Sequence, residues 1–79
     1  MFFVYVLRSL KDGRRYVGCT EDVAARLQRH NAGRVRVTRS RRPFKLIYSE
    51  AQETWSDARR REDFLKSGQG RAWLVQHGL

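Results

Sequence analysis

The dipeptide Asp12-Gly13 limits the fold more than any other feature of the sequence, because it joins two strand-like segments. Residues 2–8 (FFVYVLR) and 15–19 (RYVGC) are rich in aromatic and β-branched side chains, which favour strands. Asp-Gly is one of the preferred central pairs of a tight β-hairpin turn. Strands joined by so short a turn must be antiparallel, which excludes a doubly wound parallel sheet.

The rest of the sequence predicts one more strand and three helices. A helix capped by Thr20 or Asp22 is expected to end near Asn31, where Ala32-Gly33 follows. The later elements are expected in this order: a strand at 44–50, a helix from a cap at Ser56 to about Lys66, a break at 67–70, and a short helix at 71–77. The prediction is therefore an α+β fold with the order β-β-α-β-α-α.

The length of 79 residues allows one domain, over residues 1–79, with a small core. No apolar run approaches the roughly 18 residues of a membrane span, so no membrane partner is expected. Cys19 is the single cysteine, which excludes an internal disulfide and a thiolate zinc site. A reducing cytoplasm is the natural expectation for such a chain.

The charge of the chain indicates an anionic partner. There are 17 Lys and Arg residues against 8 Asp and Glu residues, a net charge of +9, and only three of the cations are lysines. Five arginines crowd into the segment 34–42, which contains no acidic residue: Arg34, Arg36, Arg39, Arg41 and Arg42. Arginine matches phosphate oxygens well, so we expect this cluster to bind nucleic acid, although a solubilising surface is the alternative. The segment is predicted to form turns, with a short edge strand at Val35 and Val37 left open.

Two tyrosines are expected on one face of the hairpin. A turn centred on residues 12–13 pairs Gly18 with Leu7 and, since paired residues share a face, places Tyr5 and Tyr16 on that same face. In this register the tyrosines are offset by about 13 Å, at roughly 3.3 Å per residue, so their rings are not expected to touch. Both could reach a substrate lying across the face, or both could pack against a helix.

The first helix carries polar residues beside its apolar stripe. Val23 and Leu27 form the stripe, His30 falls on it, and Arg26 flanks it. A histidine in that position requires a partner, because its burial costs desolvation. It is either a structural residue or, together with Arg26, part of a site.

The second helix also has a polar residue on its apolar stripe, in this case a carboxylate. Glu62 falls within the stripe formed by Trp55, Ala58 and Leu65, and glutamate is almost never buried unpaired. It can pair with an arginine such as Arg26 or hold a metal ion. A single carboxylate suits one hard cation such as Mg²⁺ better than zinc.

Together these residue types suit phosphodiester cleavage. That reaction needs an activated nucleophile, a cation on the non-bridging oxygens and a stabilised leaving group. General-base catalysis supplies only about 10²–10⁴-fold, so an arginine and a metal ion must contribute much of the rest.

The sequence resembles the GIY-YIG endonuclease domain, especially its small stand-alone bacterial members, which are related to the N-terminal cleavage domain of an excinuclease. The resemblance rests on these segments, in the family's order: FVY (3–5), YVG (16–18), T-x-D-x-x-x-R-L-x-x-H-N (20–31), RRPFKLIY (41–48), and A-x-x-x-E (58–62) followed by FLKSGQGR. Phe3 stands where the first motif of the family has glycine.

The resemblance implies a three-stranded antiparallel sheet flanked by helices and a catalytic set with one metal ligand. The implied roles are these: Tyr5 orders the site, Tyr16 activates or positions the attacking water, Arg26 contacts the scissile phosphate, His30 takes part in proton transfer or phosphate contact, and Glu62 binds a single Mg²⁺ or Mn²⁺.

The expected activity is a structure-selective or nonspecific DNA endonuclease that cuts branched or damaged DNA, in repair or recombination. One alternative is a non-catalytic nucleic-acid-binding module derived from a nuclease. Another is an interaction domain that docks through Trp55 or Trp73.

Overall fold

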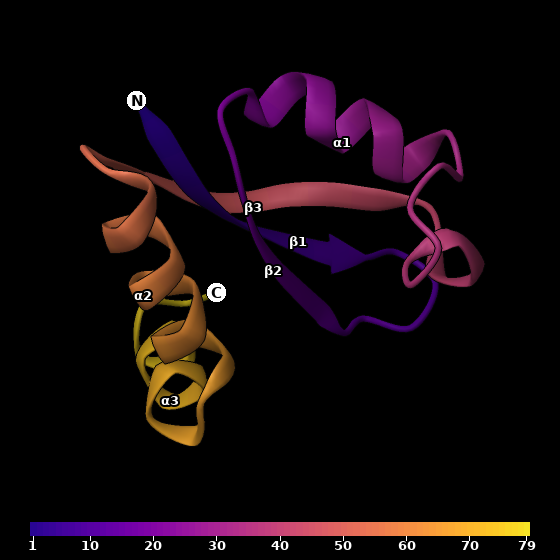
Figure 1. The fold of residues 1–79 in the computed structure, drawn as a ribbon. Helices are drawn as coiled ribbons and strands as arrows, with labels where there is room; N and C mark the ends of the chain where they lie inside the picture. The colour runs from indigo at the N-terminus through magenta and orange to yellow at the C-terminus, as the bar shows by residue number, and fades with distance from the viewer.

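Three antiparallel strands form one sheet in the order β2-β1-β3 in the computed structural model, which describes residues 1–79. The strands and helices have these bounds: β1 Phe2–Ser9, β2 Arg15–Thr20, α1 Val23–Asn31, the 3₁₀ helix η1 Arg39–Arg41, β3 Phe44–Gln52, α2 Trp55–Lys66 and α3 Gly68–Gln76. The predicted α+β class, the three-stranded antiparallel sheet and the element order are confirmed. β2 is an edge strand, so one of its sides has no neighbouring strand (Figure 1).

The hairpin register differs from the predicted one by two residues. The main-chain N–H of Ser9 donates to the carbonyl of Arg14 at 2.9 Å, and the register pairs Tyr5 with Gly18 and Leu7 with Tyr16. The predicted pairing of Gly18 with Leu7 is therefore wrong, whereas the shared face is confirmed, because a two-residue shift preserves side-chain alternation.

The buried Ser9 hydroxyl explains the longer turn. It accepts from the main-chain N–H groups of Lys11 and Asp12, both at 3.1 Å, and donates to the carbonyl of Arg41 at 2.6 Å. These bonds organise a four-residue loop in place of the two-residue turn. Gly13 still takes the left-handed conformation in it, at φ 75°.

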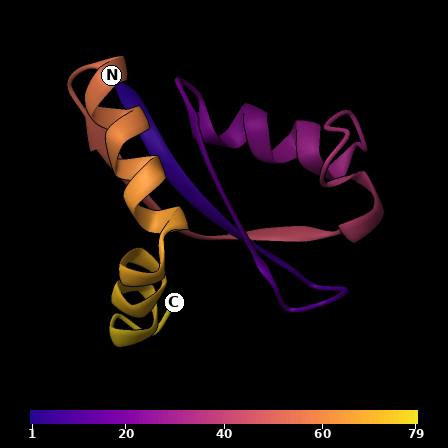
Figure 2. The same ribbon diagram turned by 60° about the horizontal axis from the view of Figure 1, so that its bottom comes forward.

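The helices cover opposite faces of the sheet. Tyr5, Leu7 and Phe44 form a core against α1, which adds Val23 and Leu27. The other face carries a separate core of β1, β2, α2 and α3 residues: Val4, Val6, Val17, Ala58, Leu65 and Leu74. In Figure 2, strand β2 runs between α1 and α2.

The helix ends follow local capping, with two differences from prediction. Asp22, one of the two expected caps, is the N-cap of α1, and its Oδ1 accepts from the Ala25 N–H at 3.0 Å. Thr54, not Ser56, caps α2. α3 begins at Gly68, so the predicted break at 67–70 is only the cap residue Ser67.

Gly70 lies inside α3 because that helix packs closely on α2. An added Cβ at position 70 would lie 1.8 Å from the carbonyl oxygen of Phe64. The glycine that reads as a helix breaker is therefore a packing residue.

The segment between α1 and β3 contains turns and η1, and the possible strand at Val35 and Val37 does not form. None of the helices has both the length and the apolar character required to span a membrane.

Candidate active site

Four of the five predicted catalytic residues line one cleft of about 320 Å³ at the outer edge of β2. They are Tyr5, Tyr16, Arg26 and Glu62. α1 brings Arg26 from one side of the sheet and α2 brings Glu62 from the other. The cleft thus straddles the edge strand.

Gly18 allows the Tyr5 ring to extend across β2 into this cleft. A Cβ at position 18 would lie 2.6 Å from the Tyr5 hydroxyl oxygen. The glycine is needed for space, because its φ is not in the left-handed region. The observed register brings the ring centroids of Tyr5 and Tyr16 to 6.4 Å, so the expectation that the rings are far apart is wrong.

His30 lies behind Tyr5 rather than in the cleft, and it is fully buried. Its Nδ1 lies 2.7 Å from the Thr38 hydroxyl, and its Nε2 lies 3.0 Å from the Tyr5 hydroxyl. Thr38 donates its own proton to the Val35 carbonyl at 3.3 Å. We therefore assign the proton to Nδ1, which donates to Thr38, and Nε2 accepts from the Tyr5 hydroxyl.

The environment keeps His30 neutral. Burial, reinforced by the positive charges of Arg26 and Arg29, lowers the pKa of His30 from 6.5 to about 4. Burial also raises the pKa of the Tyr5 hydroxyl, an effect that Arg26 opposes. Tyr5 is thus a neutral phenol held in place by a neutral imidazole.

Arg26 presents a buried donor without a partner. Its Nε is the one buried side-chain nitrogen or oxygen in the chain that has no hydrogen bond. Leaving such a group unpaired costs roughly 1–3 kcal/mol. An anionic oxygen entering the cleft would satisfy it.

Glu62 is ionised and surrounded by donors, and its side chain is 12% exposed. The thiol of Cys19 donates to Oε1 at 3.0 Å, Arg59 Nε lies 3.7 Å from the same oxygen, and Lys66 Nζ donates to Oε2. Burial alone would raise the pKa of Glu62, but the hydrogen bonds from Cys19 and Lys66 outweigh it and the pKa is lowered. The possible pair between Glu62 and Arg26 does not form.

The donors around Glu62 limit which metal ion the cleft can hold. The chain has no group of three or more His, Cys, Asp or Glu side chains that could hold a metal ion. Burial raises the pKa of Cys19 to about 12, with a further contribution from Glu62, so the sulfur is a hydrogen-bond donor and not a thiolate ligand. One carboxylate fits a hard divalent cation that takes its other ligands from water and substrate oxygens.

The hydrogen-bond and ion-pair partners of Glu62 are not predicted from the sequence, although its pattern contains a signal for two of the three. Arg59 and Lys66 lie three and four residues from it on α2, a spacing that places them on the same helix side and could have revealed them. Cys19 comes from β2, and no sequence pattern connects it with Glu62.

The predicted arginine cluster lies outside the cleft. Arg41 forms an ion pair with Asp12, with 2.9 Å between Nε and Oδ2, and Arg42 Nε donates to the Arg39 carbonyl at 2.9 Å. Arg34, Arg36 and Arg39 are the remaining three, and all of them are exposed. Four of the five arginines therefore have no ion pair within the chain, and Arg41 is the exception.

The tryptophans do not form a common apolar surface. Trp55 borders the cleft, is 44% exposed and packs edge-on against Phe2. Trp73 is partly covered by Arg61 and by a stacked His77.

Known proteins resemble this chain over most of its length. A family model described as the GIY-YIG catalytic domain matches residues 1–73. The UPF0213 proteins of Staphylococcus aureus strains Mu3 and Mu50 are each 42% identical over 66 residues, which cover 82% of this chain and 79% of theirs. The solution NMR structure of the UPF0213 protein BH0048 from Bacillus halodurans is 36% identical, with a TM-score of 0.56, and the match covers 96% of this chain and 84% of that one.

The family match includes both tyrosine motifs, the α1 arginine and the α2 glutamate, which the fold brings to one cleft. The resemblance drawn from the motifs is confirmed, and the chain belongs to the GIY-YIG family of nuclease domains, among its small stand-alone members.

Proposed function

We propose that the protein is a metal-dependent endonuclease that hydrolyses phosphodiester bonds in DNA. The observation that carries the proposal is the unpaired, buried Nε of Arg26 in the same cleft as Tyr16 and the Glu62 carboxylate. A phosphate group fits this combination, because it supplies acceptor oxygens to the guanidinium.

Arg26 stabilises the reacting phosphate. Its donors are held in place before substrate arrives, and a non-bridging oxygen replaces solvent as their partner. A preorganised donor of this kind typically contributes about 10²–10³ to the rate.

Tyr16 positions the attacking water. Its hydroxyl lines the cleft without a hydrogen-bond partner in the chain. The Tyr5 hydroxyl is bound to His30, so it orders the wall of the cleft that Arg26 also lines. His30 acts through Tyr5 and is a positioning residue in this scheme.

Glu62 would hold a single Mg²⁺ or Mn²⁺, after the ammonium of Lys66 has moved off its carboxylate. Lys66 is half exposed, so this movement is sterically open. Such an ion, when bound, supplies positive charge to the phosphate and increases the acidity of water. The carboxylate is suited to this role because its lowered pKa keeps it ionised.

The arrangement of the cleft and the arginines fits an enzyme that cuts branched or damaged DNA, either structure-selectively or nonspecifically. Its role would be in repair or recombination. The unpaired arginines Arg34, Arg36 and Arg39 attract the phosphate backbone irrespective of base sequence.

A metal titration of cleavage tests the proposal. The purified protein is incubated with Mg²⁺ or Mn²⁺ and a panel of plasmid, linear, flap and junction DNA. We expect cutting that requires the ion and is abolished by Glu62→Gln, while Arg60→Ala, at a side chain 80% exposed on α2, cuts like the wild type. Cutting by Glu62→Gln at the wild-type rate would overturn the role of the carboxylate.

A non-catalytic nucleic-acid-binding module is the second candidate. It is favoured by the ion pair between Glu62 and Lys66, because a tethered ammonium occupies the proposed metal ligand. This candidate predicts salt-sensitive binding of DNA, with no cutting for any combination of substrate and ion in the panel.

A further inference from the structure

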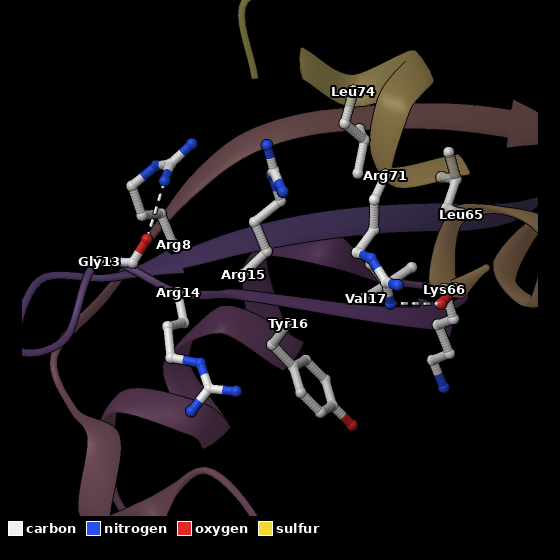
Figure 3. A pocket seen from close by; sticks show the side chains of 10 residues that line it. All are labelled: Arg8, Gly13, Arg14, Arg15, Tyr16, Val17, Leu65, Lys66, Arg71 and Leu74. Carbon is white, nitrogen blue, oxygen red and sulfur yellow. Dashed lines mark hydrogen bonds between the residues drawn. The ribbon is translucent and has the colours of Figure 1, made fainter. Parts of the chain in front are cut away.

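A second cavity, of about 550 Å³, lies along β2 next to the catalytic cleft (Figure 3). We call it the basic trough, and define it by its five cationic side chains, Arg8, Arg14, Arg15, Lys66 and Arg71. No carboxylate lines it. The sequence disperses these residues over the hairpin, α2 and α3, so no local charge pattern reveals them.

The basic trough adjoins the catalytic cleft. Tyr16 lines both, and Lys66 lines the trough while its ammonium reaches Glu62 in the cleft. In Figure 3, Arg14, Tyr16 and Lys66 point to the same side of β2. The two cavities therefore lie next to each other along β2, the edge strand of the sheet.

Two of the five cations are available to bind an anion. The Arg14 guanidinium makes no hydrogen bond or ion pair within the chain. Arg71 makes one long hydrogen bond, at 3.3 Å, to the Lys66 carbonyl, which holds the side chain without neutralising it. Arg15 is engaged by the main-chain oxygen of Leu79, and Arg8 donates to the Gly13 carbonyl.

The trough also has an apolar lining. Val17, Leu65 and Leu74 contribute it from β2, α2 and α3. Cations above an apolar surface suit a ligand with phosphates on one side and sugar or base on the other, as a nucleic-acid strand has.

We propose that the basic trough binds the phosphates next to the scissile one, so that a nucleic-acid strand follows the outer edge of β2 from Arg26 toward Arg14 and Arg71. This proposal rests on the proposed function, and it assigns the position of the substrate strand. From Gly18 to Arg14 the edge measures about 13 Å, at roughly 3.3 Å per residue.

Binding in the absence of a divalent ion tests the trough separately from catalysis. Fluorescence anisotropy in EDTA is measured with labelled single-stranded and duplex oligonucleotides over a range of salt concentrations. The test variant carries Arg14→Ser and Arg71→Ser. The matched variant carries Arg34→Ser and Arg36→Ser, which removes the same charge from the segment after α1.

We expect the Arg14→Ser/Arg71→Ser protein to bind about tenfold more weakly, with a salt slope smaller by about 1.4–1.8 for two lost phosphate contacts. The Arg34→Ser/Arg36→Ser protein is expected to lose about threefold or less. An equal or larger loss in the second variant would overturn the trough as the principal strand-binding surface, as would an unchanged slope in the first.

The outcomes separate the two proposals. Trough-dependent binding by a protein that cuts nothing with Mg²⁺ or Mn²⁺ supports the trough and defeats the nuclease. Cutting that is unaffected by Arg14→Ser/Arg71→Ser at limiting substrate supports the nuclease and defeats the trough.

Discussion

Several arginines lie along the outer edge of β2 and several lie in the segment 32–43, but the two groups differ in their hydrogen bonds and in whether they line a cavity. In the segment, Arg41 and Arg42 are bound to Asp12 and to the Arg39 carbonyl, and neither lines a cavity. Beside β2, Arg26 lines the cleft and has a buried, unpaired Nε, while Arg14 lines the trough and has an unpaired guanidinium. Density of positive charge in the sequence therefore does not reveal which arginines line a cavity.

The two regions are connected through His30. Its Nε2 accepts from Tyr5 in the cleft, and its Nδ1 donates to Thr38 in the segment. Through Thr38 and His30, the segment therefore helps to hold Tyr5 in the wall of the cleft. Four predictions follow the difference between the regions, from the largest expected effect to the smallest.

Arg26→Ala is expected to reduce the cleavage rate by about 10²–10³-fold, because it removes a preorganised donor to the phosphate. The free energy of unfolding should stay the same or increase, since the variant also removes a buried unpaired N–H. The measurements are single-turnover cleavage and urea unfolding, with Arg60→Ala as control. A large loss of stability would show that Arg26 is a structural residue.

The free energy of unfolding is expected to fall by about 3 kcal/mol as the pH is lowered from 6.5 to about 4, owing to His30. The lowered pKa means that the unfolded chain binds a proton in this range and the folded chain does not, so acid favours unfolding. Urea midpoints against pH measure the effect. His30→Gln should remove this part of the slope, whereas His77→Gln, at an exposed site, should keep it.

Gly18→Ala is expected to destabilise the protein by about 1–3 kcal/mol, because the new methyl group would overlap the buried Tyr5 ring. Gly68→Ala is the matched control, since a Cβ there has no closer neighbour than Arg71 at 3.9 Å. Thermal unfolding compares the two variants. Equal stability of both would mean that Tyr5 can leave its position without cost.

Asp12→Asn is expected to have the smallest effect. The hydrogen bond from the Arg14 main chain, with further help from Arg41, lowers the pKa of Asp12 to about 2, but the carboxylate is exposed to solvent. Exposed ion pairs contribute little to stability. Urea unfolding should show a slight loss, and anisotropy should show unchanged DNA binding. Tighter binding, owing to the released guanidinium of Arg41, would bring the segment 32–43 back as the principal nucleic-acid surface.

The sequence by itself determined the element order, the start of the first helix after Thr20 or Asp22, and the common face of Tyr5, Tyr16 and Gly18. These depend on local rules: turn chemistry, capping and the two-residue period of a strand. It also marked Arg26, His30 and Glu62, because polar residues on apolar stripes require partners.

The tertiary structure decided which residues became the partners of these polar side chains. The register depended on Ser9 meeting the Arg41 carbonyl, Glu62 is held by Cys19 from β2, and His30 became a neutral support because burial opposes its charge. The trough arises where the hairpin, α2 and α3 converge. Such contacts join residues far apart in the chain, and their energies depend on distance and desolvation, which no local pattern encodes.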